Sequence, residues 1–193
     1  AVLGTGVIAN EMAQALQKQG KSLYSVGNRT YEKAVAFGEQ YGISKVYTDF
    51  QQIFTDPEVD AIYITTPHNT HREFMEMAIE NGKHILVEKS ITLNSKELDE
   101  MIHLADKKGV VIAEAMTIYH MPIYQKLKEI IQSGKIGKVN LITMNFGSLK
   151  EYDMKNRFFN RNLAGGAMLD IGVYALSCLR WFMESKPDQL ISQ

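Results

Sequence analysis

The first nine residues constrain the fold more than any other stretch of the chain. They read Ala1-Val2-Leu3-Gly4-Thr5-Gly6-Val7-Ile8-Ala9, the pattern of a buried strand, a glycine turn and the first turn of a helix. Gly4 permits a sharp turn, Gly6 leaves room for a ligand to approach the backbone, and Ala9 lets helix and strand pack closely. Free N–H groups at the start of a helix attract phosphate. This G-x-G-x-x-A spacing indicates a dinucleotide-binding turn, or else a tight turn that binds nothing.

Composition limits the classes of protein that the chain can belong to. The 193 residues carry a net charge of -1, with 45% hydrophobic and 22% charged residues, which is typical of a globular chain of one or two domains. The charge gives no reason to expect nucleic acid or a membrane surface as a partner. We see no apolar run near the ~20 residues that span a bilayer.

Cysteine content and the chain ends suggest a cellular setting. The single cysteine, Cys178, excludes an internal disulfide framework and fits a reducing compartment, so we expect a cytoplasmic protein. The chain starts without methionine, inside its first expected strand, and we interpret it as a fragment of a longer protein.

Short apolar strands alternate with helices over the first 115 residues. Strands are expected at residues 22–26, 45–47, 60–65, 83–87 and 110–113, and helices at 10–18, 31–41, 49–54, 71–81 and 98–108. In the last of these helices Met101, Ile102, Leu104 and Ala105 are expected on the core side. This alternation predicts an α/β domain with a parallel sheet and right-handed crossovers over residues 1–115.

Polar residues follow the expected strands at the point where each strand ends. These are Asn28 and Arg29 after the second strand, the run Thr66-Pro67-His68-Asn69-Thr70-His71 after the fourth, Glu88 and Lys89 after the fifth, and Glu114 after the last. Ligands of parallel sheets bind beyond the carboxyl ends of the strands. The gathering of polar residues there predicts that this edge binds the cofactor.

The end of the second strand bears on the choice of cofactor. An acidic residue about twenty positions after the glycines would hold the 2′-hydroxyl of NAD. Asn28 and Arg29 stand there instead, and an arginine suits the 2′-phosphate of NADP. Arg29 could also be a solvated turn residue, but with the glycines upstream we favour NADP over NAD.

The pattern changes after residue 115. A helix is expected at residues 122–132 with Ile123, Leu127 and Ile130 toward a core, followed by an alternating antiparallel strand at 137–147 and a loop at 148–162. A last helix is expected from about residue 169 to 184. We interpret residues 116–193 as the start of a second, α+β domain.

Three side chains are candidates for chemistry. Lys89 leaves a buried strand beside the expected nicotinamide, where its amine could polarise a substrate oxygen or relay a proton. Asp170 and Tyr174 are four residues apart on the last expected helix and would share a face. A phenol with a pKa of ~10 is a poor base at neutral pH, and a nearby lysine such as Lys89 would lower that value.

Structural explanations remain open for the same residues. Lys89 could be an ordinary solvated lysine, Asp170 could cap the helix and Tyr174 could pack in a core. The five histidines have no metal-site spacing, so no metal is expected, and Cys178 fits a small core residue better than a nucleophile.

Taken together, the motifs resemble those of the Gfo/Idh/MocA family of NAD(P)-dependent oxidoreductases over nearly the whole chain. The matching features are the opening glycine turn, Thr66-Pro67 with His71, Glu88-Lys89, Glu114-Ala115-Met116, and Gly165-Gly166-Ala167 leading to Asp170-Ile171-Gly172-Val173-Tyr174. The resemblance implies a Rossmann domain followed by a domain with a large, open, mainly antiparallel sheet, much of which this chain would lack. It also implies a homo-oligomer, and hydride transfer between a nicotinamide and a sugar, polyol or related hydroxyl.

Two departures from the family pattern are informative. Ser90 replaces the proline of the family's Glu-Lys-Pro. The family has a commoner Asp-x-Gly-x-x-x-His pattern and a shorter Asp-x-Gly-x-His form, and Tyr174 stands in the last place of the shorter form. A tyrosine at this position resembles the branch that contains dihydrodiol dehydrogenases and NADP-dependent D-xylose dehydrogenases. In that branch a tyrosine paired with the lysine is the acid/base. The resemblance implies Lys89, Tyr174 and Asp170 as catalytic residues. Cofactor contacts are expected from Gly4, Thr5, Gly6, Val7, Ile8, Asn28, Arg29, Thr66, Pro67, Asn69, His71, Glu88 and Lys89.

Three functional hypotheses follow. The first is an NADP-dependent oxidoreductase acting on an aldose, polyol or cyclic diol. The second is a glycosidase that uses bound NAD in a cycle of oxidation, elimination and reduction. The third is a non-catalytic module that senses NADP(H).

Overall fold

The computed structural model describes residues 1–156, 158–183 and 185–191. Contacts divide the chain into two compact units. The first unit comprises Ala1–Ala115 with Asn162–Ala164, and the second comprises Met116–Arg161 with Gly165–Gln193.

The first unit is built on a six-stranded, wholly parallel sheet. Its strands are β1 (Val2–Leu3), β2 (Ser25–Gly27), β3 (Lys45–Val46), β4 (Ala61–Ile64), β5 (His84–Val87) and β6 (Ile112–Glu114). They lie in the order β3-β2-β1-β4-β5-β6. This arrangement confirms the predicted α/β fold. The order reverses between β1 and β4, which is the point at which open parallel sheets form their ligand crevice.

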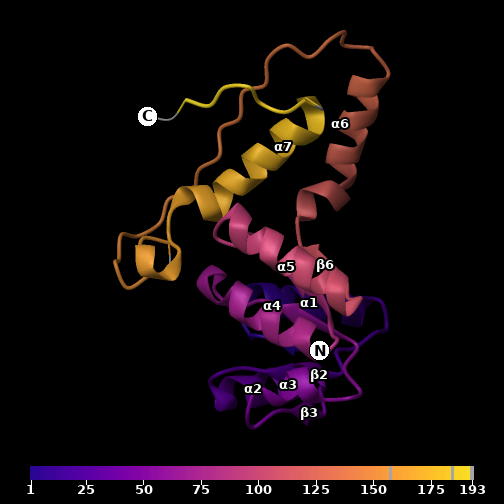
Figure 1. The fold of residues 1–193 in the computed structure, drawn as a ribbon, viewed down its shortest axis with the longest axis vertical. Coiled ribbons are helices and arrows are strands. Elements are labelled where there is room, and N and C mark those ends of the chain that lie inside the picture. Colours follow the sequence, from indigo (N-terminus) through magenta and orange to yellow (C-terminus); the bar gives the residue numbers. More distant parts are fainter. Residues whose placement is uncertain (157, 184, 192–193) are drawn as a thin grey trace. The chain divides into compact units, whose positions relative to one another are not determined.

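Five α-helices cover the two faces of this sheet (Figure 1). Because side chains alternate across a strand, Val2 and Tyr63 pack with α1 (Val7–Lys18) and α2 (Tyr31–Tyr41). Their neighbours Leu3, Ile62 and Ile64 belong to the opposite core, which contains residues of α3 (Gln52–Thr55), α4 (His71–Glu80) and α5 (Ser95–Lys108).

Several predicted boundaries of these elements were wrong by a few residues. Helix α1 begins at Val7, directly after Gly6, and α5 begins at Ser95. The side chain of Asn94 caps α5 by accepting a hydrogen bond from the N–H of Glu97 at 3.0 Å, which places the helix start earlier than the hydrophobic pattern suggests. Ile102 was expected in the core and is 46% exposed, because it lies on the outer face of α5.

The second unit is helical and irregular in its described residues. It contains a 3₁₀ turn (Thr117–His120), α6 (Pro122–Gln132), a π-helical turn (Met168–Gly172) and α7 (Val173–Met183), and a 3₁₀ turn at Arg161–Leu163 lies where the two units alternate along the chain. Met116, Ile118 and Cys178 form its small core. The buried Cys178 agrees with the predicted core role for this residue.

Two predictions for this unit are wrong. Residues 137–147 form no strand, and no described residue after Glu114 belongs to a sheet, so this segment has no partner for a hydrogen-bonded ladder. On α6, Ile123 and Leu127 are 58% and 40% exposed, because no described element covers that face. Glu184, the predicted end of the last helix, lies outside the described residues.

One segment tests the expectation that no stretch of the chain could span a bilayer. Among the described residues, Arg161–Met183 is helical, long and apolar enough to do so by length and composition alone. A single helix of this kind is weak evidence for a membrane span, since core helices of globular proteins pass the same test. The segment also contains ionisable residues, Asp170 among them.

A buried carboxylate ties together the amino-terminal edge of the sheet. Asp56 follows α3, and its carboxylate forms an ion pair with Lys45 on β3 at 2.5 Å. It also accepts hydrogen bonds from the Tyr47 hydroxyl at 2.5 Å and the Glu58 N–H at 3.0 Å. The Lys45 and Tyr47 bonds hold the pKa of Asp56 at about 2, while burial and the Asp56 contact raise the pKa of Tyr47 to about 12.

This network predicts a pH-dependent stability. Because the pKa of Asp56 is lower in the folded than in the unfolded chain, its stabilisation is complete above about pH 4 and is lost as the pH falls toward about 2. The melting temperature of Asp56→Asn should lie below that of the parent at pH 6, and the gap should narrow between pH 4 and pH 2. Asp99→Asn, which removes an exposed carboxylate on α5, is the control. A gap that stays constant down to pH 2 would contradict this account.

Candidate functional site

The carboxyl ends of five strands form a continuous edge. The register pairs Leu3 with both Gly27 and Ile64, then Ile64 with Val87 and Val87 with Glu114. The residues that come next are held in the same row. Gly4 N–H donates to Gly27 C=O at 2.9 Å, Thr65 N–H to Leu3 C=O at 2.9 Å, and Glu88 N–H to Ile64 C=O at 3.0 Å. The glycine turn and the predicted polar residues after β2, β4 and β5 therefore follow adjacent strands.

Gly4, the residue after β1, lies close against Thr65, the residue after β4. Its φ of +107° is a backbone conformation that other residues rarely adopt. A Cβ atom there would lie 2.5 Å from Thr65 Oγ1 and 3.2 Å from Thr65 C=O. The hydroxyl of Thr65 is fixed in turn by donating to Leu3 C=O at 3.0 Å. Gly4 is thus required by the fold itself.

Gly6 has a different role, because a Cβ atom there would meet no protein atom within 4 Å. It is the N-cap of the twelve-residue α1 and leaves the first N–H groups of the helix without a side-chain cap. Asn10 donates from Nδ2 to the carbonyls of Thr5 and Gly6 at 3.2 and 2.8 Å, which fixes the turn. Open space in front of free N–H groups at a helix start fits the diphosphate of a dinucleotide.

The end of β2 is linked directly to this turn. Asn28 donates from Nδ2 to Thr5 Oγ1 at 3.1 Å, and the next residue, Arg29, is exposed. Asn28 therefore supports the turn, whereas the guanidinium of Arg29 is accessible to a ligand. Val7 and Ile8 are also exposed, at 73% and 38%.

The loop after β4 is held by its own side chains. Thr70 Oγ1 donates to Pro67 C=O at 2.7 Å and lies 2.8 Å from Thr66 Oγ1. Asn69 is exposed, but His71 is completely buried. The ring nitrogens of His71 lie 2.9 Å from Thr66 C=O and 2.9 Å from Ser90 C=O, so this side chain supports two loops and presents no nitrogen to a ligand.

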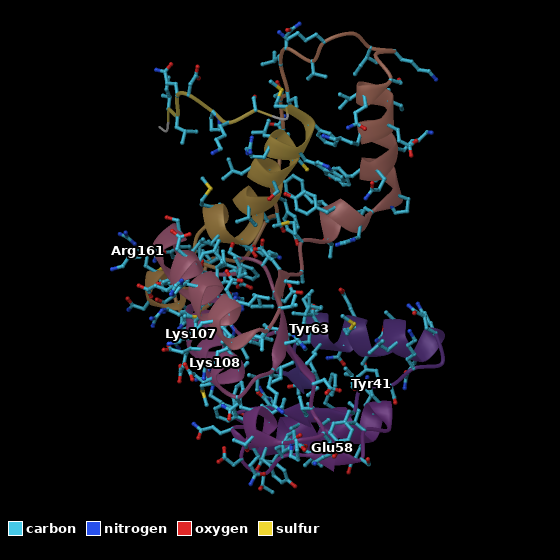
Figure 2. All side chains as sticks on the ribbon, turned by 45° about the vertical axis from the view of Figure 1, so that its right-hand side comes forward. Tyr41, Glu58, Tyr63, Lys107, Lys108 and Arg161 are labelled. Atoms are coloured by element: carbon cyan, nitrogen blue, oxygen red, sulfur yellow. The ribbon has the colours of Figure 1, made fainter. Side chains whose placement is uncertain are left out.

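Glu88 and Lys89 leave β5 toward the same edge. Glu88 is half-buried and accepts a hydrogen bond from the hydroxyl of Tyr63 on β4, which is labelled in Figure 2. Burial raises the pKa of the Glu88 carboxyl, and the Tyr63 bond partly opposes this. Lys89 is partly exposed, and the Lys89–Ser90 peptide bond is cis.

Asp170 and Tyr174 belong to the second unit. Asp170 lies within the π-helical turn, and Tyr174 is the second residue of α7. A π turn has i→i+5 bonds, so the α-helical spacing by which these residues were predicted to share a face is interrupted at Asp170. The ring of Tyr174 stacks on Phe146, with centroids 6.1 Å apart and planes inclined by 28°.

Two residues of the site were missed as site residues by the sequence interpretation. Tyr63 binds Glu88, and its signal was a phenol within an apolar buried strand, since a buried hydroxyl needs a partner. Glu114, which the sequence placed at the cofactor edge without a role of its own, accepts a hydrogen bond from the N–H of Ile91 at 2.9 Å. In the part of the chain that the structure describes, no cluster of three or more metal-ligating residues occurs.

Comparison with known proteins agrees with this geometry. Residues 1–116 match the oxidoreductase family Gfo/Idh/MocA, NAD-binding Rossmann fold, and residues 124–193 match the Gfo/Idh/MocA C-terminal domain. The chain belongs to the Gfo/Idh/MocA family. Its first unit is therefore the NAD-binding Rossmann domain of this family, and the resemblance noted from the sequence motifs is confirmed.

Relatives of known name lie in the branch that the sequence suggested. The chain is 31% identical to trans-1,2-dihydrobenzene-1,2-diol dehydrogenase of Xenopus laevis, covering 100% of this chain and 59% of the relative. It is 27% identical to D-xylose 1-dehydrogenase (NADP(+)) 2 of Haloferax volcanii, covering 98% and 58%. The chain therefore spans somewhat more than half the length of these Gfo/Idh/MocA relatives.

A solved structure shares the fold. A mutant 3-ketoreductase from Actinomadura kijaniata, crystallised with TDP-benzene and NADP, superposes with a TM-score of 0.82 at 24% identity. The match covers 94% of this chain and 56% of the other.

Substitutions of the two glycines should have different effects, one on stability and the other on cofactor binding. Gly4→Ala should destabilise the protein by about 1–3 kcal/mol, because of backbone strain and the Thr65 contact. Gly6→Asp should keep the melting temperature, since aspartate is a good N-cap, yet weaken NADP⁺ binding at least about a hundredfold by repelling the phosphates. Urea unfolding and calorimetric titration measure the two effects. Unchanged NADP⁺ affinity in Gly6→Asp would contradict the assignment of this turn.

Proposed function

We propose that the full-length protein is an NADP-dependent oxidoreductase that transfers hydride between the nicotinamide and a hydroxyl or carbonyl carbon of a sugar, polyol or cyclic diol. The observation that carries the choice of cofactor is the end of β2, where exposed Arg29 follows Asn28 and no carboxylate is present. The names of the dihydrodiol and NADP-dependent xylose dehydrogenases support the substrate class.

The proposed roles of the residues follow from the chemistry of alcohol oxidation, in which a hydride and a proton leave the same CH–OH group. The bound nicotinamide supplies the hydride acceptor. Tyr174 takes the hydroxyl proton, or returns it in the reverse direction, and the Lys89 ammonium stabilises the phenolate. Asp170 orients a substrate hydroxyl by accepting its hydrogen bond. Lys89 belongs to the first unit, and Tyr174 and Asp170 belong to the second.

Arg29 gives a test of the cofactor. Arg29→Ser should weaken binding of NADP⁺ by about ten- to a hundredfold, the worth of about 1.5–3 kcal/mol for a charge-assisted contact, and leave NAD⁺ binding within about threefold. Lys21→Ser removes one positive charge from the turn between α1 and β2, at the other end of β2, and is the control. Calorimetric titration with both dinucleotides gives the comparison. Equal weakening of NADP⁺ and NAD⁺ binding in Arg29→Ser would refute selection of the 2′-phosphate.

Lys89 and Tyr174 give a test of the chemistry. Lys89→Met and Tyr174→Phe should each lower kcat at least about a hundredfold, while NADPH still binds, because each removes a group that acts on the transferred proton. Exposed residues of the same types provide matched controls, Lys96→Met and Tyr152→Phe. Turnover of a panel of aldoses and diols by the full-length protein is followed at 340 nm. Near-normal kcat in either variant would overturn the assignment.

A further inference from the structure

Two ionisable side chains from different elements contact the backbone of the segment that follows Lys89. Ser90 C=O lies 2.9 Å from Nδ1 of His71, the first residue of α4. Ile91 N–H donates to the carboxylate of Glu114, the last residue of β6, at 2.9 Å. These two groups are the C=O and the N–H of one peptide unit, Ser90–Ile91, the second after Lys89, and the side chains that hold them come from separate elements.

His71 couples this segment to a second loop. Its other ring nitrogen lies 2.9 Å from Thr66 C=O, in the loop after β4. Both neighbours of the ring are carbonyl oxygens, which only accept hydrogen bonds, and the side chain has no exposed surface. Burial lowers the pKa of His71, and the neutral ring carries one N–H, which donates to one of the two carbonyl oxygens. Moving the loop that accepts this bond would leave a buried N–H without its partner, which is costly.

Glu114 closes the other side. It is the last residue of β6, which pairs with β5 through Val87, so its position is fixed relative to the start of the Lys89 segment. Burial raises the pKa of the Glu114 carboxyl, as does the charge of Glu88, and the bond from Ile91 opposes both. A half-buried carboxylate beside another carboxylate is an unfavourable arrangement that the contact with Ile91 offsets.

We propose that His71 and Glu114 are positioning residues for Lys89: they fix the Ser90 carbonyl and the Ile91 amide, and thereby aim the Lys89 amine at the reacting oxygen. This rests on the proposed catalytic role of Lys89. An amine on a flexible four-carbon stem needs its backbone fixed, because a displacement of about 1 Å at the reacting atoms can cost about a hundredfold in rate. Neither residue contacts substrate in this proposal.

Glu97 offers a matched control on the same chain. Its carboxylate also accepts a hydrogen bond from a backbone N–H of the loop between β5 and α5, from Leu93 at 3.1 Å. This contact lies closer to the start of α5 and further from Lys89. Glu97→Ala removes the bond to Leu93, a similar bond in the same loop, and leaves the hydrogen bonds to Ser90 and Ile91 in place.

The test combines steady-state kinetics with a double-mutant cycle in the full-length protein. Glu114→Ala should lower kcat about tenfold and leave the KM for NADP(H) within about threefold, whereas Glu97→Ala should change kcat less than about twofold. Glu114→Gln, whose amide oxygen still accepts from Ile91, should restore kcat to within about threefold. In a Lys89→Met background, adding Glu114→Ala should lower kcat by less than about twofold relative to Lys89→Met alone, because the effect of Glu114 acts through Lys89.

The possible outcomes separate this inference from the proposed function. Near-normal kcat in Lys89→Met would overturn the function itself. Two results would overturn only the positioning role, provided that Lys89→Met itself lowers kcat strongly. One is an unchanged kcat in Glu114→Ala. The other is a double variant in which Glu114→Ala lowers kcat by the same factor as it does in the parent. Should Glu114→Ala fail to fold, Glu114→Met fills the half-buried site and is read in the same way, and His71→Phe tests the opposite grip.

Discussion

The close approach of Gly4 to Thr65 is the constraint on which the rest of the first unit depends. These residues follow neighbouring strands at the point where the strand order reverses, and only a residue without Cβ fits between them. The turn at Gly4 lets α1 begin three residues later, with its first N–H groups facing open space beside Gly6. How β1 and β4 pack thus leaves an uncapped helix start with open space in front of it, which fits a phosphate.

Side-chain hydrogen bonds then join the strand ends to one another. Asn28 reaches Thr5, Tyr63 reaches Glu88, and His71 joins the loop after β4 to the loop after β5. Loops beyond a sheet have no regular ladder to define them, so such bonds determine their positions. The amino-terminal edge is tied separately, by Asp56 with Lys45 and Tyr47. The Asp56 network therefore lies at the edge of the sheet opposite to the candidate site.

The sequence predicted those features that depend on local pattern. The parallel sheet, the turn at Gly4 and Gly6, and the polar strand ends all follow from alternating elements and glycine spacing. The contacts of His71 and Glu114 could not be predicted, because they depend on strand register and on loops that meet across it. In the second unit, residues 137–147 have the alternation of a strand without a described partner, and the π turn at Asp170 has no local pattern that distinguishes it from an α-helix.

The most direct test of the central claim is a ¹H–¹⁵N NMR titration of the protein with NADP⁺. The account predicts that the largest amide shifts occur at Gly6, Val7 and Ile8, at the start of α1. The amides of Gly20 and Gly42, which follow the ends of α1 and α2 at the opposite edge of the sheet, should remain in place. Saturable binding of NADP⁺ without a change in the chemical shifts of these three amides would contradict the account.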